Sequence, residues 1–354
     1  MRPSLYAMTT PELLRRLPKV QLHCHLEGTT PASTFVELAR RSGVSTDYQE
    51  TGFRDVAPAD VYRFANMGEF LFKFAALSRS LRDTADYVRI LEEYAQDAIA
   101  HNVMYAELFL SPSVWSFFHR DLDIRATIAR LYDRAEAIEG HSGLRMRFIC
   151  DLTRNFGSVR AMETAQLAAG LQEHGVIGIG LGGDEANFPA QLFVDAFAYA
   201  RDAGLRCVAH AGEAAGAQSV RDALNHLHAE RIGHGVRAIE DAQLVAELAA
   251  RKVPLEVCPT SNLRTGVVAR DGEQPLRKLY EAGVVVCVDS DDPAIFGTDI
   301  TQEYLFAENQ LGLEAALQIA RSAIDASFAS DGLKAGLYRR FDAACAELLA
   351  ERRT

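Results

Sequence analysis

The sequence predicts an α/β protein in which eight parallel strands close into a (β/α)8 TIM barrel. Eight short apolar runs recur along the chain, and from the second onward each run starts a few tens of residues after the last. That spacing leaves room for one crossover helix per step, which is typical of repeated βα units. The runs are Val20–His25, Val103–Leu110, Arg145–Leu152, Val176–Leu181, Arg206–His210, Arg231–His234, Leu255–Cys258 and Val284–Asp289.

One domain accounts for the whole chain. No linker rich in Pro, Gly or Ser and no low-complexity segment divides the 354 residues. Because α/β barrels of this size form one domain, we expect a single barrel domain over residues 1–354. An open, doubly wound sheet is the alternative, but its Gly-rich dinucleotide fingerprint is absent after the first run.

The first interval is much longer than the others and predicts a helical insertion over residues 29–100. An insertion at the carboxyl end of the first strand lies over the mouth of the barrel. Aromatic residues follow a helical spacing from Val61 to Phe74, with Phe70 and Phe74 four residues apart. We expect Phe70 and Phe74 to contact substrate from a lid or pocket wall. Packing against the side of the barrel is the alternative.

The composition limits the partners. Lys and Arg total 37 against 48 Asp and Glu, so the formal net charge is −11. Nucleic-acid binding needs a basic field, so a small neutral or cationic ligand fits better. No apolar stretch approaches the ~18 residues that cross a bilayer, and the N-terminus lacks a signal-peptide pattern. We therefore expect a cytoplasmic protein without nucleic-acid or membrane partners. The six cysteines form no Cys-x-x-Cys pair, which favours free thiols over a zinc finger.

Two histidines end the first predicted strand. His23 and His25 are two residues apart, so both point to the same face of the strand. At the carboxyl end of a barrel strand this is a metal-ligand arrangement. His226 and His228 have the same spacing but lie in a helical pattern, where the rings diverge, and we interpret them as surface residues.

Other predicted strands also end in polar groups. Each could be structural on its own, as a buried histidine, a helix cap or a glycine turn. Together they gather at the end of the barrel where active sites form. The segments are Gly183–Glu185 after the fourth strand, His210–Glu213 at the fifth, Gly233–Gly235 at the sixth and Asp289–Pro293 at the eighth.

Three imidazoles and one carboxylate, from His23, His25, His210 and Asp291, suit Zn²⁺. A second metal would need a bridging group, such as a carbamylated lysine after the fourth strand. The lysines are Lys19, Lys73, Lys252, Lys278 and Lys334, and none ends a predicted strand. We therefore expect one zinc ion per chain.

These motifs resemble the adenosine deaminase family of the amidohydrolase superfamily. The resemblance runs in order from Leu17 to about Tyr304, through His23-x-His25-Leu26-Glu27-Gly28 and the four segments above. It implies that His23, His25, His210 and Asp291 are the zinc ligands. It also implies that Glu213 protonates purine N1, and that His234 orients and deprotonates the attacking water. By the same resemblance Asp292 contacts purine N7, and the Gly183 backbone N–H contacts N3.

Glu27 is where the chain departs from the pattern. Adenosine-specific members carry Asp at this position, and that carboxylate meets the ribose 5′-hydroxyl. Glu27 instead resembles adenine deaminases and deaminases of 5′-modified nucleosides, notably aminodeoxyfutalosine of menaquinone synthesis. The end of the second strand, Phe109–Ser113, is closer to the nucleoside enzymes. We predict deamination of adenosine or a 5′-modified adenosine nucleoside to the inosine-type product and ammonia. Aminodeoxyfutalosine or adenine as the substrate is the alternative.

Two other functions compete. A catalytically silent zinc barrel that only binds nucleosides would be expected to lose Glu213 or His234, and both are present. A two-metal hydrolase of cyclic amides or phosphoesters would need the lysine that the fourth strand lacks.

Overall fold

Eight parallel strands form the centre of the molecule, as predicted. They occur in the order β1 to β8, each beside the next in the sequence. The computed structural model describes residues 8–46, 56–269 and 275–353. The strands are β1 (Lys19–His25), β2 (Val103–Leu110), β3 (Arg145–Thr153), β4 (Val176–Gly182), β5 (Arg206–Ala211), β6 (Arg231–His234), β7 (Leu255–Val257) and β8 (Val286–Val288).

The barrel closes between β1 and the segment that follows β8. The His25 backbone N–H donates to the Asp291 carbonyl at 2.9 Å, and the Asp291 N–H donates to the His23 carbonyl at 3.0 Å. These bonds make Asp291 part of the barrel wall beside β1. The prediction of a strand over Val284–Asp289 was too long at both ends, since β8 covers only Val286–Val288. Beyond it the chain bends into the site, because Asp291 adopts φ 61°, which no strand residue has.

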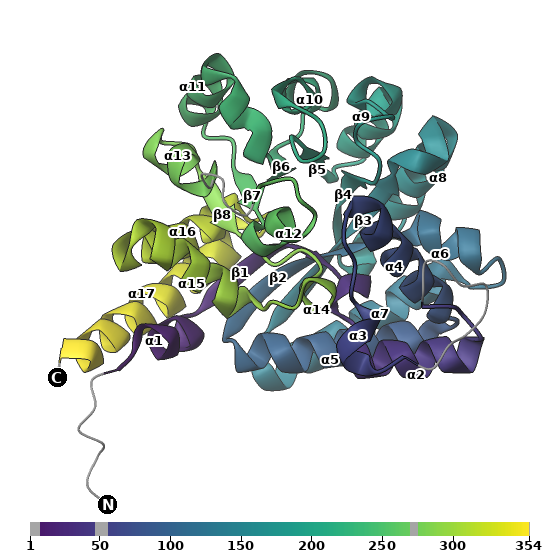
Figure 1. Cartoon of the computed structure of the whole chain (residues 1–354), viewed down its shortest axis with the longest axis horizontal. Coiled ribbons are helices and arrows are strands. Elements are labelled where there is room, and N and C mark those ends of the chain that lie inside the picture. The colour runs from purple at the N-terminus through teal and green to yellow at the C-terminus, as the bar shows by residue number, and fades with distance from the viewer. Residues whose placement is uncertain (1–7, 47–55, 270–274, 354) are drawn as a thin grey trace, which may run out of the picture.

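Helices surround the barrel (Figure 1). The long ones after the insertion are α7 (Ile124–Ser142), α8 (Gly157–Ala169), α9 (Val194–Asp202), α11 (Ala242–Arg251), α15 (Ile300–Leu311), α16 (Leu313–Ala326) and α17 (Asp331–Arg353). Shorter helices are α1 (Thr10–Arg16), α6 (Pro112–Phe118), α10 (Ala217–Asp222), α12 (Pro259–Arg264), α13 (Pro275–Glu281) and α14 (Pro293–Phe296). Single turns are η1 (Glu27–Thr29), η2 (Arg154–Phe156), η3 (Gln172–His174), η4 (Ala190–Phe193), η5 (Ala223–Leu227) and η6 (Val236–Glu240). An ion pair between Arg16 and Glu351 joins α1 to α17.

The described part of the insertion is helical. It comprises α2 (Ala32–Ser42), α3 (Pro58–Val61), α4 (Met67–Ser80) and α5 (Thr84–Ala100), while residues 47–55 of the predicted insertion lie outside the described residues. The predicted helical segment from Val61 to Phe74 is broken, and Phe64 lies in the break. The cause is Asn66, whose extended backbone (φ −157°) and side chain cap the new helix by accepting from the Glu69 N–H.

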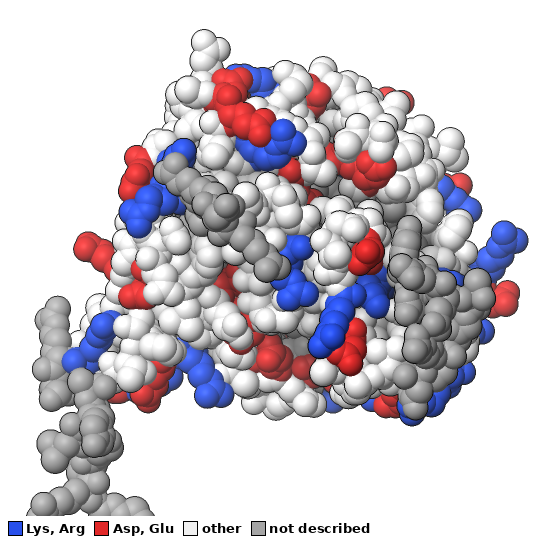
Figure 2. All heavy atoms as spheres, in the orientation of Figure 1, with Lys and Arg blue, Asp and Glu red and all other residues white. Residues whose placement is uncertain are grey.

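Other predictions concern the surface and the thiols. His226 and His228 are exposed, as predicted. All six cysteines are free, and five are buried. Among the described helices, none is long and apolar enough to cross a membrane. Figure 2 shows Lys and Arg scattered among Asp and Glu on one face, without a continuous basic field.

Candidate active site

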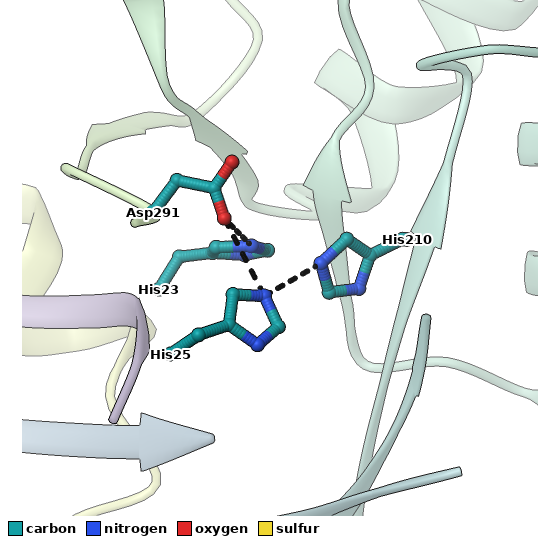
Figure 3. Close-up of side chains that lie close together, drawn as sticks. All are labelled: His23, His25, His210 and Asp291. Carbon is teal, nitrogen blue, oxygen red and sulfur yellow. Dashed lines mark hydrogen bonds and ion pairs between the residues drawn. The ribbon is translucent and has the colours of Figure 1, made fainter. Parts of the chain in front are cut away.

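Three histidines and one aspartate converge at the carboxyl end of the barrel (Figure 3). His23 and His25 come from the end of β1, His210 from β5, and Asp291 from the turn after β8. The Nε2 atoms of His25 and His210 lie 3.2 Å apart. Asp291 Oδ1 lies 3.5 Å from His23 Nε2 and 3.4 Å from His25 Nε2. The structure thus brings together the four residues predicted to hold a metal, and all four are buried.

The donor set fits a tetrahedral zinc ion. Bonds of ~2.0–2.2 Å place the ligand atoms of a tetrahedron ~3.3–3.6 Å apart. The three separations given above run from 3.2 to 3.5 Å, and all four ligand atoms lie within 4.8 Å of one another. His23 Nδ1 contacts Glu256 Oε2 at 2.8 Å, and His23 Nε2 is buried without a hydrogen-bond partner in the part of the chain that the structure describes. Burial lowers the pKa of His25 to about 4, so its imidazole is the neutral form that binds metal.

A second group of possible ligand atoms shares Asp291. It consists of His234, Cys258 and Asp291. Burial raises the pKa of the Cys258 thiol well above its usual range. Because metals bind the thiolate, this second group is the weaker candidate.

Two residues of the site have a backbone conformation that is rare for residues other than glycine. His234 has φ 58° and Asp291 has φ 61°, both in the left-handed region. Such residues cost about 1–3 kcal/mol and persist where the surrounding structure fixes them. For Asp291 the two backbone hydrogen bonds to β1 provide that constraint.

Glu213 and His234 face the same cavity and have opposite pKa shifts. Burial raises the pKa of Glu213 to about 8, and the negative charges of Asp291 and Glu185 add to the effect. Burial lowers the pKa of His234 to about 3. At neutral pH the pair is therefore a protonated carboxylic acid beside a neutral imidazole. The His234 Nδ1 atom contacts the Asn262 side-chain amide at 3.1 Å.

Glu185 fixes the turn that carries Glu213. Its carboxylate accepts backbone hydrogen bonds from Gly212 at 2.6 Å, Glu213 at 3.2 Å and Ala215 at 2.9 Å. Three bonds to one carboxylate hold the turn after β5 in one conformation. The acid is therefore presented from a rigid element rather than from a mobile loop.

Asp292 lies against Gly28, the glycine of the first motif. A Cβ atom at Gly28 would overlap the Asp292 carboxyl group, so only glycine fits there. Burial and the neighbouring Asp291 raise the pKa of Asp292 well above its usual range, which favours a protonated side chain. Its Oδ1 atom is buried and has no partner among the described residues.

A cavity of about 400 Å³ opens beside these groups. Phe70 and Phe74 from α4 line it, as does Gly183, whose φ of 95° a glycine adopts readily. Its described lining is His25, Met67, Gly68, Phe70, Leu71, Phe74, Ser111, Val114, Asp151, Thr153, Asn155, Gly182, Gly183, Asp184, Glu185, Ala186, His210, Glu213, Ala214, His234, Asp291 and Asp292.

Glu27 lies apart from that lining. It is fully buried, and its Oε1 atom accepts from the Trp115 indole N–H at 2.5 Å and from the Ser111 backbone N–H at 3.2 Å. Burial raises the pKa of Glu27. In this conformation the carboxylate anchors α6 to the end of β1. That Glu27 binds the substrate remains a prediction.

Three acidic residues around this site have no role predicted from the sequence: Asp151 on β3, Glu185 after β4 and Glu256 on β7. Glu256 contacts both His23 and the buried Arg231. Asp151 and Glu256 each interrupt an apolar strand, in Phe148-Ile149-Cys150-Asp151 and Leu255-Glu256-Val257. A charged residue inside a buried strand needs a partner. An acidic residue inside an apolar run is therefore a sequence signal that could have identified Asp151 and Glu256.

The family model described as adenosine deaminase matches residues 18–344. An aminodeoxyfutalosine deaminase from Streptomyces avermitilis is 37% identical over 341 residues, covering 94% of this chain and 93% of that protein. An adenine deaminase from Sinorhizobium medicae is 37% identical over 317 residues, covering 89% of this chain and 95% of that protein.

Solved structures share the fold over nearly the whole chain. An adenine deaminase from Arthrobacter aurescens has a TM-score of 0.84 at 30% identity, covering 94% of this chain and 99% of that one. An amidohydrolase from Burkholderia ambifaria with bound Zn has a TM-score of 0.83 at 29% identity, covering 98% of this chain and 97% of that one. The N6-methyl-AMP deaminase from Arabidopsis thaliana has a TM-score of 0.82 at 28% identity, covering 95% of this chain and 99% of that one.

Proposed function

The chain belongs to the adenosine deaminase family, hydrolases that act on C–N bonds of cyclic amidines, and from this premise we propose that it is a zinc-dependent deaminase of adenosine or a 5′-modified adenosine nucleoside. The observation that carries the proposal is the pairing of a four-residue zinc site with Glu213 and His234 on one cavity. Zinc held by His23, His25, His210 and Asp291 would supply a Lewis acid that lowers the pKa of water to about 7.

The side chains of the cavity account for the proton transfers. Glu213 in its acid form donates a proton to purine N1 as the water oxygen bonds to C6, and neutral His234 takes one proton from that water. The proton on His234 passes to the 6-amino group, the C6–N bond breaks, and ammonia leaves. The remaining hydroxyl proton returns to Glu213, so the product carries a carbonyl at C6 and a proton on N1.

Recognition of the purine follows from two further groups. A protonated Asp292 donates a hydrogen bond to N7, and the Gly183 backbone N–H donates to N3. Both contacts come to this chain from the resemblance, and the raised pKa of Asp292 supports the first. Intact acid, imidazole and recognition groups argue against a silent nucleoside-binding barrel.

Cavity size and charge favour a nucleoside. A volume of about 400 Å³ is in the range for ligands much larger than a free base. The outer wall, with Met67, Phe70, Leu71 and Phe74, is apolar and suits an aromatic 5′ extension. The described lining contains no Lys or Arg and several carboxylates, so a 5′-phosphate would be repelled. Aminodeoxyfutalosine is supported by the Streptomyces relative.

Adenine is the second candidate. Two observations favour it. The Sinorhizobium adenine deaminase is 37% identical to this chain, and the Glu at position 27 resembles that of adenine deaminases.

The test of the proposed function is ammonia release from adenosine, deoxyadenosine, aminodeoxyfutalosine, adenine and AMP, compared by kcat/KM. We expect a nucleoside without phosphate to rank first. A preference for adenine would replace the nucleoside assignment, and no release from any of them would remove the deaminase proposal.

A further inference from the structure

Asp151 is a buried carboxylate that the proposed chemistry leaves without a role. It lies on β3, is only 5% exposed and lines the cavity. Its Oδ1 atom has no hydrogen-bond partner among the described residues. Leaving a buried acceptor without a partner is unfavourable, so Asp151 Oδ1 is expected to accept a hydrogen bond when the site is occupied.

Two glycines on the neighbouring strand make room for this carboxylate. Asp151 pairs with Gly180, and Thr153 with Gly182, in the parallel register of β3 and β4. A Cβ atom at Gly180 would lie 2.5 Å from Asp151 Oδ1, and a Cβ at Gly182 would overlap Asp151 Oδ2. The carboxyl group therefore fills the space that side chains at Gly180 and Gly182 of β4 would occupy.

His210 on β5 has the complementary unpaired atom. Its Nε2 atom faces His25 in the ligand cluster, and its Nδ1 atom is buried without a partner among the described residues. If Nε2 binds metal, the neutral ring carries its proton on Nδ1, which is then an unmatched donor. The pairing of Ile179 with Cys207, continued along both strands, places Gly182 beside His210.

We propose that Asp151 is the positioning residue for His210, accepting a hydrogen bond from His210 Nδ1 across the glycine gap when Nε2 holds the metal. Histidine ligands commonly donate their second N–H to a carboxylate, which fixes the ring orientation. His23 already has such a partner in Glu256, at 2.8 Å. The inference rests on the metal site in the proposed function.

The test measures zinc affinity by competition with a chelator. Asp151→Leu removes the acceptor but keeps the volume, and we expect zinc to bind ~10–100-fold more weakly. Asp151→Asn keeps an amide oxygen that can accept, so its loss should be smaller. Asp184→Asn is the matched control, because Asp184 also lines the cavity but bonds to Asn187, and its zinc affinity should be unchanged.

Two further measurements separate the outcomes. The metal-free Asp151→Leu protein should unfold at the same or a higher temperature than the unaltered protein, because an unpaired buried carboxylate is gone. Zinc affinity within threefold of the unaltered protein would overturn the inference, and a raised KM alone would then make Asp151 a substrate contact. His210→Ala tells the two failures apart. If it keeps full zinc affinity, or if the unaltered chain binds no zinc, the metal site itself fails.

Discussion

The Oε2 atom of Glu213 lies 3.7 Å from the Nε2 atom of His234. This separation exceeds a hydrogen bond, so neither side chain is committed to the other and both remain available to a molecule in the cavity. The Glu185 carboxylate accepts a hydrogen bond from the Glu213 backbone N–H, and the Asn262 side-chain amide contacts His234 Nδ1.

Glu213→Gln should abolish turnover while zinc stays bound. The amide keeps the shape of the side chain but has no acidic proton to give to N1. General acid–base groups contribute ~10²–10⁴-fold to rate, so kcat should fall by at least that factor. Metal content and kcat measured on one preparation check this, with His210→Ala as the contrasting variant that loses metal. Near-normal kcat would refute the acid role.

Activity should decline on the alkaline side near pH 8. Burial raises the pKa of Glu213 to about 8, so the acid form prevails below that pH and is lost as the pH rises through it. A plot of log(kcat/KM) against pH should bend there and then fall by one unit per pH unit. Glu185→Gln removes a charge that raises the Glu213 pKa, so its bend should move to lower pH. An unchanged bend would show that another group titrates.

One zinc per chain should suffice for full activity. The four candidate ligand residues form one cluster, and no described lysine stands at the carboxyl end of a strand to bridge a second ion. Removing metal with a chelator should abolish activity, and titration with zinc should restore it at about one equivalent. Full activity without metal, or a requirement for two equivalents, would contradict this.

Glu27→Asp should destabilise the protein. The shorter side chain would withdraw from the Trp115 indole N–H, which it contacts at 2.5 Å inside the core. A buried donor left unpaired costs about 1–3 kcal/mol, measurable by denaturant unfolding. Trp115→Phe in the Glu27→Asp background removes the unpaired donor and should recover part of the loss. A variant of unchanged stability that turns over adenosine faster would instead indicate that the side chain at position 27 contacts the substrate.

The architecture, and the convergence of the candidate metal ligands at one end of the barrel, could be predicted from the sequence because both depend on short-range patterns. Strand runs separated by helix-length intervals specify a parallel barrel, and the carboxyl ends of its strands meet at one face. Side chains two apart on a strand share a side, which is why His23 and His25 were predicted to act together. The structure then placed His210 and Asp291 within reach of them.

Only the tertiary structure decided which buried groups contact one another and which remain charged. The pairing of His23 with Glu256 joins residues 233 positions apart, and the burial of Glu27 against Trp115 joins residues 88 apart. The protonation of Asp292 depends on Asp291 and on burial. Such contacts and shifts arise from distances across the folded barrel and from the loss of water around each group. Local periodicity in the sequence indicates the strands, the helices and the motifs at the strand ends. It does not indicate these long-range contacts or the pKa shifts that follow from burial.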